Sequence, residues 1–154
     1  MFRLTPARLL VLLIVIFLGI PIHEWAHGWM AYVLGDETPE IQGRLTLNPF
    51  VHLDPIGTLM ILFTGYGWGR SAKVNPYRMS RVGSARTGMA LSALAGPMSN
   101  IIQAVLFALP IRLGLLDRLP SAQAERLGQV LIAVIGVNVG LAVFNMIPIP
   151  PLDG

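Results

Sequence analysis

The sequence predicts an all-α polytopic membrane protein with three long transmembrane helices and one short re-entrant or extended segment at about residues 56–68. Of its 154 residues, 54% are hydrophobic and 12% are charged, and the mean hydropathy is +0.65. A soluble domain of this size could not cover so much apolar surface, so a lipid bilayer is the expected solvent. Three of four apolar stretches are long enough to cross a hydrocarbon core, which takes about 20 helical residues.

The first apolar stretch covers roughly Ala7 to Leu34. Two arginines precede its core, as they would in a signal peptide, but no small-residue cleavage site follows. The helical pattern continues instead to Gly35, where a glycine is a natural helix end. We therefore expect a permanent membrane helix.

The second stretch, from Ile56 to Trp68, is too short to span and is rich in glycine, with Gly57, Gly65, Gly67 and then Gly69. Glycine weakens a helix and suits backbone that bends or approaches another element closely. A re-entrant or partly extended segment is expected, covered by protein because exposed backbone does not survive at membrane depth. A short tilted helix is the alternative.

The third and fourth stretches, Gly88 to Leu116 and Leu127 to Ile147, predict two further spans. The polar segments 43–55 and 70–81 carry Pro, Asn and Gly and predict ordered loops or short strands near the membrane surface. No internal repeat or linker is present, so residues 1–154 are expected to form a single transmembrane domain.

The charges and the lack of cysteine exclude several functions. With no cysteine, disulfides, thiolate metal sites and cysteine nucleophiles are ruled out, and any metal must bind His, Asp or Glu. The net charge is +3, but the basic residues are spread along loops without the aromatic interleaving of a nucleic-acid surface. We interpret them as charges that set the topology, with no nucleic-acid partner.

The strongest chemical signal is the HExxH motif His23-Glu24-Trp25-Ala26-His27 near the end of the first span. Residues at i and i+4 share one helical face, so two imidazoles can bind one Zn²⁺ while Glu24 lies beside it as the base for a water molecule. The metal lowers the pKa of that water to about 7. A chance grouping in a core is the alternative, but each ionisable residue in a bilayer costs about 2.5 to 3.5 kcal/mol without a partner.

Catalytic zinc usually has three protein ligands, so a third must come from outside the motif. The acidic candidates elsewhere in the chain are Asp36, Glu37, Glu40, Asp54, Asp117, Glu125 and Asp153. Asp153 stands out because it follows an apolar helix and a proline-rich segment, 148–152, that would hold the carboxylate in place. His52 and Asp54 are a weaker alternative for a metal or proton-relay role, with a structural role favoured.

Four motifs together resemble the site-2 protease family of intramembrane zinc metalloproteases, and most closely its compact prokaryotic members without PDZ or CBS domains. They occur in the family's order and cover nearly the whole chain: HExxH at 23–27, an NPxxHxDPxGT-like stretch at 48–58, AGPxxN at 95–100 and NxxPxxPLDG at 145–154.

The resemblance implies that His23, His27 and Asp153 bind zinc, that Glu24 activates water and that Asn145 lies near the scissile peptide. Asn100 is a lesser candidate for a supporting role. The implied substrate is a transmembrane protein, cut by regulated intramembrane proteolysis, and a regulatory membrane protein or an oligomer is a further expected partner. Chains of this family usually continue past the LDG motif, so a truncated core is expected.

The proposed metal site also predicts a topology. For the end of the first span and Asp153 to reach one ion, the first and last spans must run in the same direction. One crossing must lie between them, which the third stretch supplies if the short second stretch turns back. Loop charges and the resemblance favour a site that opens towards the cytoplasm, with the protein in the inner membrane of a prokaryote.

Two other functions compete with proteolysis. A non-hydrolytic metal-ion transporter or metal-binding membrane protein would carry ligands on several helices along a path, often on inverted repeats. A catalytically silent scaffold for a regulatory partner would leave Glu24 without a purpose.

Overall fold

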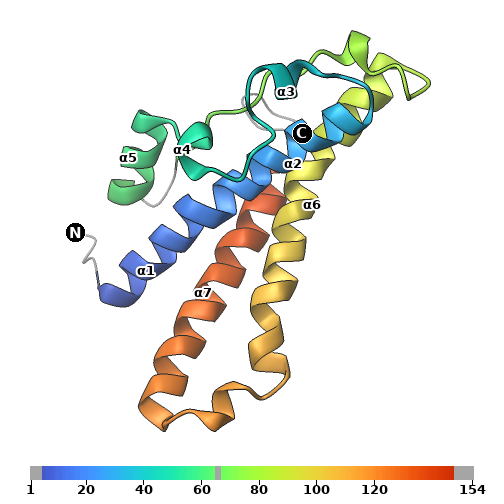
Figure 1. Ribbon diagram of the computed structural model, residues 1–154. Coiled ribbons are helices and arrows are strands. Elements are labelled where there is room, and N and C mark those ends of the chain that lie inside the picture. The colour runs from blue at the N-terminus through green and yellow to red at the C-terminus, as the bar shows by residue number, and fades with distance from the viewer. Residues whose placement is uncertain (1–4, 65–66, 148–154) are drawn as a thin grey trace.

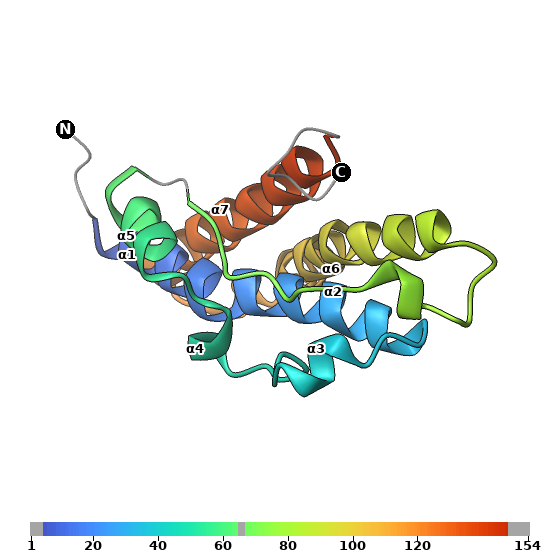
Figure 2. The same ribbon diagram turned by 90° about the horizontal axis from the view of Figure 1, so that it is seen from above.

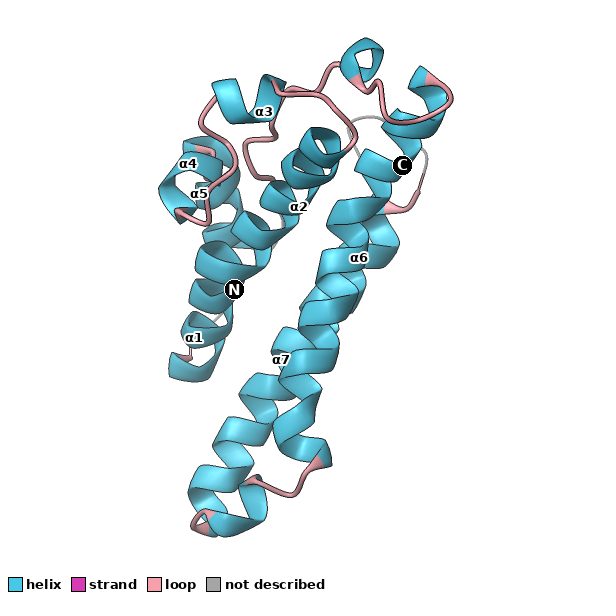
Figure 3. Cartoon of the chain, turned by 45° about the vertical axis from the view of Figure 1, so that its right-hand side comes forward, coloured by secondary structure: helices cyan, strands magenta, loops and turns pink. Residues whose placement is uncertain are grey.

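The computed structural model describes residues 5–64 and 67–147. Helices and loops make up this part of the chain, and no strand occurs within it (Figure 3). In chain order the helical elements are α1 (Pro6–Ile14), the π-helical turn η1 (Val15–Gly19), α2 (Ile20–Val33), α3 (Thr38–Ile41), α4 (Pro49–His52), α5 (Pro55–Thr64), the 3₁₀ turn η2 (Pro76–Arg78), α6 (Ala85–Arg112), the 3₁₀ turn η3 (Leu116–Arg118) and α7 (Ser121–Asn145).

The first long helix runs without a break from Pro6 to Val33 but widens by one residue at η1. Pro21 has no N–H and cannot bond to the carbonyl four residues earlier. Just before it, the N–H of Ile20 bonds to the oxygen of Val15, five residues back, as in a π-helix. The helix ends where the sequence predicts, with Gly35 at a φ of 111°.

The short second stretch does not span. Its first part is the ten-residue helix α5, and the chain then returns so that Leu53 and Gly69 form an antiparallel bridge. A Cβ on Gly57 would lie 2.2 Å from the carbonyl oxygen of Trp68, so only glycine lets the returning chain pass this close. The predicted re-entrant path is thus confirmed, with the helical alternative correct for residues 56–64 of the stretch.

The three long helices form an up-down-up arrangement. The first span and α7 run in the same direction, and α6 runs between them in the opposite direction (Figure 1). α6 packs against both α2 and α7, and α7 packs against α1. This is the topology that the sequence requires if residues at the ends of α2 and α7 are to meet.

The long helices leave much of their apolar surface uncovered. Their most apolar 18-residue windows have mean hydropathies of 2.2, 1.5 and 2.2, yet only 56%, 33% and 28% of those windows is buried within the protein. The buried apolar cluster joins the first span to α5 and α7 and consists of Val11, Leu12, Val15, Ile16, Ile20, Ile61, Val130 and Val134. Apolar faces of this extent are expected to contact lipid, so the protein is an integral membrane protein.

Loops enclose the end of the first span on the side away from α6. Viewed from above, α3 and α4 lie on one side of α2 and α6 lies on the other, while the extended segment 67–75 passes along α2 (Figure 2). Asp36, fully buried, accepts hydrogen bonds from Thr38 N and Asn75 N and so fastens this segment to the end of α2.

Candidate metal centre

The HExxH motif lies on α2 with its three ionisable side chains buried. His23 and Glu24 are each 6% exposed and His27 is 8% exposed. One turn of helix brings the two imidazoles together, so that the Nε2 atoms lie 3.0 Å apart and the rings meet edge to face. The predicted pairing of two imidazoles on one helical face is therefore present.

The tautomer of His23 is set by a chain of hydrogen bonds that ends on a backbone carbonyl. The Asn138 amide donates from Nδ2 to Val134 O at 3.0 Å, which leaves its oxygen to accept from Asn100 Nδ2 at 2.8 Å. Asn100 Oδ1 then faces Nδ1 of His23 at 2.5 Å. Because a carbonyl oxygen can only accept, each amide is oriented in turn and Nδ1 of His23 must carry the proton.

The tautomer of His27 follows from one contact. Its Nδ1 lies 2.7 Å from the backbone oxygen of Ser92 on α6, which can only accept, so this nitrogen also donates. The Ser92 hydroxyl donates in return to the backbone oxygen of His27 at 3.1 Å. These two hydrogen bonds fix the orientation of the His27 ring and the register of α6 against α2.

Both Nε2 atoms consequently carry lone pairs that point into the same small space. Two lone pairs 3.0 Å apart repel one another unless a cation or a proton lies between them. Two nitrogens bound to one tetrahedral zinc ion at 2.0–2.1 Å are about 3.3 Å apart, close to the observed spacing. Histidines that bind zinc through Nε2 usually donate a hydrogen bond from Nδ1–H to an oxygen, as both histidines do here. The residues present fit a zinc ion.

Glu24 lies beside the imidazoles with part of its carboxylate unsatisfied. Its Oε2 atom is buried and has no hydrogen-bond partner among the residues that the structure describes. Its Oε1 atom would be 2.9 Å from a Cβ on Gly69, so the extended segment passes directly against the carboxylate. A buried carboxylate oxygen with no donor can accept a proton or a hydrogen bond from a bound molecule.

Arg44 brings positive charge to the same region. It donates to the carbonyl oxygens of Val51 and Arg70 and so ties the loop before α4 to the extended segment. Burial lowers the pKa of the Arg44 guanidinium and the charge of Arg70 lowers it further, while the Glu24 carboxylate acts in the opposite direction. An arginine stays protonated at neutral pH, so a cation lies within electrostatic reach of Glu24.

Gly96 gives the imidazoles their space on α6. A Cβ at this position would lie 2.2 Å from Nε2 of His27 and 2.8 Å from Cε1 of His23. No side chain fits there, which explains the glycine in the AGPxxN motif. Its proline, Pro97, is also buried in α6.

Comparisons with known proteins agree with this geometry. The chain is 40% identical over 145 residues to a Bacillus subtilis protein named "Putative zinc metalloprotease YwhC", covering 93% of this chain and 65% of that protein. It is 34% identical over 143 residues to "Putative zinc metalloprotease Rip2" of Mycolicibacterium smegmatis, covering 89% of this chain and 51% of that protein. A Mycobacterium tuberculosis protein of the same name is 32% identical over 139 residues, 86% of this chain and 50% of its own length.

These matches confirm the resemblance to the site-2 protease family that the sequence motifs indicate. The chain spans between half and two thirds of the length of these relatives. No protein-family model matches it. No solved structure gives a significant match.

Among the site residues that the sequence predicted, the structure brings together His23, Glu24, His27 and Asn100. Asn145 is the last residue of α7 and is partly buried. Asp153, the third ligand expected from the sequence, lies outside the described residues. Within the described part of the chain, no group of three His, Cys, Asp or Glu side chains could hold a metal.

The weaker sequence candidates have local structural contacts. The fully buried His52 lies with Nε2 2.7 Å from Thr46 O. Asp54 accepts from the N–H of Gly57 at 2.8 Å and so caps the first turn of α5. These contacts agree with the structural role that the sequence favoured for both residues.

The sequence did not predict two residues that hold the imidazoles in place: Ser92, which contacts His27, and Asn138, which acts on His23 through Asn100. Asn138 carried a usable signal, because a single amide inside an apolar span almost always faces the protein interior and a polar partner. Ser92 contributes chiefly its backbone carbonyl. Every residue type has this group, so the sequence cannot indicate its role.

Proposed function

We propose that the protein is an intramembrane zinc metalloprotease, which hydrolyses a peptide bond within or near a transmembrane helix of a substrate protein. One observation carries the proposal: two buried imidazoles on a membrane-spanning helix, both with Nδ1 engaged by an oxygen and with Nε2 atoms 3.0 Å apart, next to a buried carboxylate. The relatives named as zinc metalloproteases support the same chemistry.

In this proposal His23 and His27 bind one zinc ion through Nε2, and Asp153 supplies the third ligand. Bound zinc would lower the pKa of water in the site to about 7. The hydrogen bonds from Asn100 and Ser92 keep both rings in the ligating tautomer, so that little reorganisation is needed when the metal enters.

Glu24 acts as the general base. Its unpaired Oε2 atom can accept the proton of the attacking water, and Arg44 stabilises the carboxylate before that transfer. The close passage of Gly69 shields the carboxylate from bulk solvent. Asn145, at the end of α7, is proposed to donate to or accept from the scissile peptide.

The substrate is proposed to bind as an unwound, extended segment. In the extended chain 67–75, Lys73 exchanges two hydrogen bonds with the side chain of Gln42. The N–H and C=O groups of Ala72 and Val74 have no hydrogen bond within the described residues. Neighbouring residues of an extended chain direct these groups to opposite edges, so one edge is occupied and the other is available to a substrate backbone.

The protein is proposed to lie in the inner membrane of a prokaryote, with the site towards the cytoplasm. The segment between the first span and α6 contains five basic residues, Arg44, Arg70, Lys73, Arg78 and Arg81, and Arg86 follows in the first turn of α6. Short loops rich in Lys and Arg stay on the cytoplasmic side.

Cleavage in lipid vesicles tests the proposal against metal transport. The full-length protein would be reconstituted with a model transmembrane-helix substrate, and both peptide products and zinc movement into the vesicles would be measured. We expect cleavage that a zinc chelator abolishes and added zinc restores. Zinc uptake without cleavage would instead favour a transporter.

A further inference from the structure

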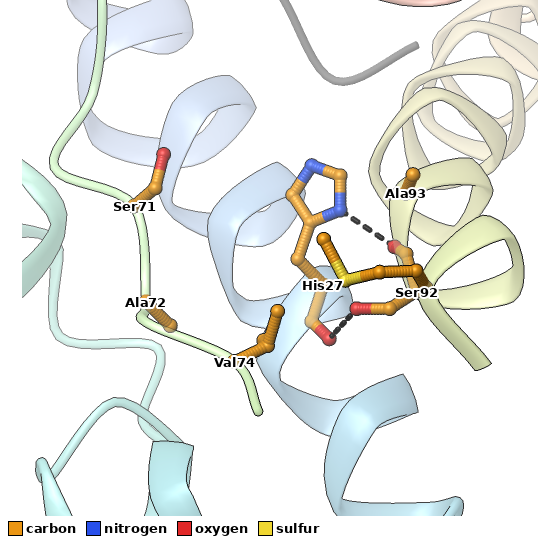
Figure 4. A pocket seen from close by; sticks show the side chains of 7 residues that line it. His27, Ser71, Ala72, Val74, Ser92 and Ala93 are labelled. Carbon is orange, nitrogen blue, oxygen red and sulfur yellow. Dashed lines mark hydrogen bonds between the residues drawn. The ribbon is translucent and has the colours of Figure 1, made fainter. Parts of the chain in front are cut away.

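A pocket opens beside His27, on the side where α6 faces the extended segment. Its volume is about 220 Å³. Ser71, Ala72 and Val74 line one wall and Met89, Ser92 and Ala93 line the other, with His27 between them (Figure 4). The extended segment and helix α6 thus enclose one space next to an imidazole of the candidate metal centre.

The lining defines which chemistry the pocket accepts. Apart from His27 it contains no ionisable side chain, and its other side chains offer methyl groups, one thioether and two hydroxyls. The Ser92 hydroxyl already donates to the backbone of His27. A charged group would be desolvated there without a partner, whereas an apolar group would be stabilised by burial.

The size of the pocket suits one large apolar side chain. A cavity of about 150 Å³ is enough for a benzene ring, so 220 Å³ accommodates Leu, Met or Phe. Small-molecule sites are usually larger, about 300–1,000 Å³.

The position of the pocket indicates where that side chain comes from. Ala72 and Val74, whose backbone groups form the available edge, also line the pocket. A peptide extended along this edge would direct alternate side chains to the same face, and one of them would enter the pocket next to His27.

We infer that this pocket is a specificity site, which takes one large apolar side chain of the substrate next to the cut and whose depth is set by Met89 and Ala93. The inference rests on the proposed proteolytic function. It makes substrate choice depend on one side chain as well as on how easily the substrate helix unwinds. One methylene group in such a pocket changes kcat/KM by about 10- to 200-fold.

The test uses the full-length protein in lipid vesicles and substrates that carry Gly, Ala, Leu or Phe at each of four positions around the cut. Unaltered protein should prefer Leu or Phe over Ala by roughly tenfold or more at one position only. Ala93→Leu, which fills the pocket, should shift the preference at that position to Ala or Gly. Met89→Ala, which deepens the pocket, should shift it towards Phe.

Ala90→Leu is the matched control, because Ala90 is exposed on the same helix and does not line the pocket. It should leave the profile unchanged. If Ala93→Leu proves unstable, Met89→Ala still decides the question, since it only removes atoms. Cleavage with the same profile in all variants would overturn the inference while leaving the proposed function intact, and absence of cleavage by the unaltered protein would reject both.

Discussion

His23 and Asn100 lie 77 residues apart in the chain, yet Nδ1 of the imidazole is 2.5 Å from Oδ1 of the amide. Asn138 orients that amide from the third long helix. A single line of hydrogen bonds therefore connects all three membrane-length helices at the depth of the candidate metal centre. In an apolar environment such a network specifies one register of packing, because any other register leaves buried amides unpaired.

This network predicts how zinc affinity responds to its members. Asn100→Ala should weaken zinc binding by roughly 10- to 100-fold, as loss of a hydrogen-bond partner of a metal-ligating histidine typically does. Asn138→Ala should act in the same direction but less. Because both act through His23, the double variant should bind zinc no more weakly than Asn100→Ala alone.

Competition with a chelator of known affinity would measure these effects. Gln129→Ala on the exposed part of α7 serves as the control and should change nothing. Fully additive losses in the double variant would show that the two amides do not act through one path.

Gly96 predicts a second, steric effect. Gly96→Ala should abolish zinc binding and cleavage, because the added methyl group would overlap Nε2 of His27. Gly136→Ala is the matched control on α7, since a Cβ there meets nothing within 4 Å. Helix propensity alone would make either change favourable by up to about 1 kcal/mol. Equal zinc content in the two purified variants would refute the steric argument.

Asp153 is the third ligand of the proposed centre. Asp153→Asn should weaken zinc binding and cleavage together, because an amide is a poorer ligand and leaves the dication without a compensating carboxylate. Zinc content of the purified variant would measure this. Full occupancy would mean that the third ligand lies elsewhere, and Asp54 would be examined first, although it now caps α5.

The substrate helix should control the rate of cleavage. A peptide bond in a regular helix has its carbonyl engaged, and freeing backbone groups inside a bilayer is costly. Gly or Pro near the cut should therefore speed cleavage, and a helix of Leu and Ala alone should resist it. The two substrates would be compared at equal membrane insertion, and similar rates would contradict an unwound bound state.

The fold could be predicted from the sequence where length and apolar composition decide it. Three spans, the short second stretch and the helix end at Gly35 all depend on local signals. The sequence did not predict the π-helical turn at Val15–Gly19. A proline such as Pro21 removes one backbone hydrogen bond, but the sequence does not show how the helix adjusts to that loss. That residues 56–69 begin as a helix and then return as an extended chain was also only partly predictable. The extended part is held by contacts with Gly57 and His52, which depend on tertiary packing.

The same division applies to the candidate site. His23, Glu24 and His27 follow from spacing on one helix, which the sequence displays directly. Asn138 and the Ser92 carbonyl reach the imidazoles only through the packing of α6 and α7, and the available backbone at Ala72 and Val74 depends on where the loop lies. Contacts between distant segments are set by tertiary packing, and a single sequence does not encode them in any local pattern.

Glu24→Gln tests the central claim most directly, because it separates metal binding from hydrolysis. The side chain keeps its size and the two imidazoles keep their hydrogen bonds, but an amide cannot take the proton of the attacking water. Glu40→Gln is the matched control, because Glu40 is an exposed carboxylate on α3. Zinc content and cleavage of a transmembrane-helix substrate would be measured on the same purified samples. The account predicts near-normal zinc with no cleavage in Glu24→Gln and normal values of both in Glu40→Gln, whereas sustained cleavage by Glu24→Gln, or equal loss of zinc and cleavage, would contradict it.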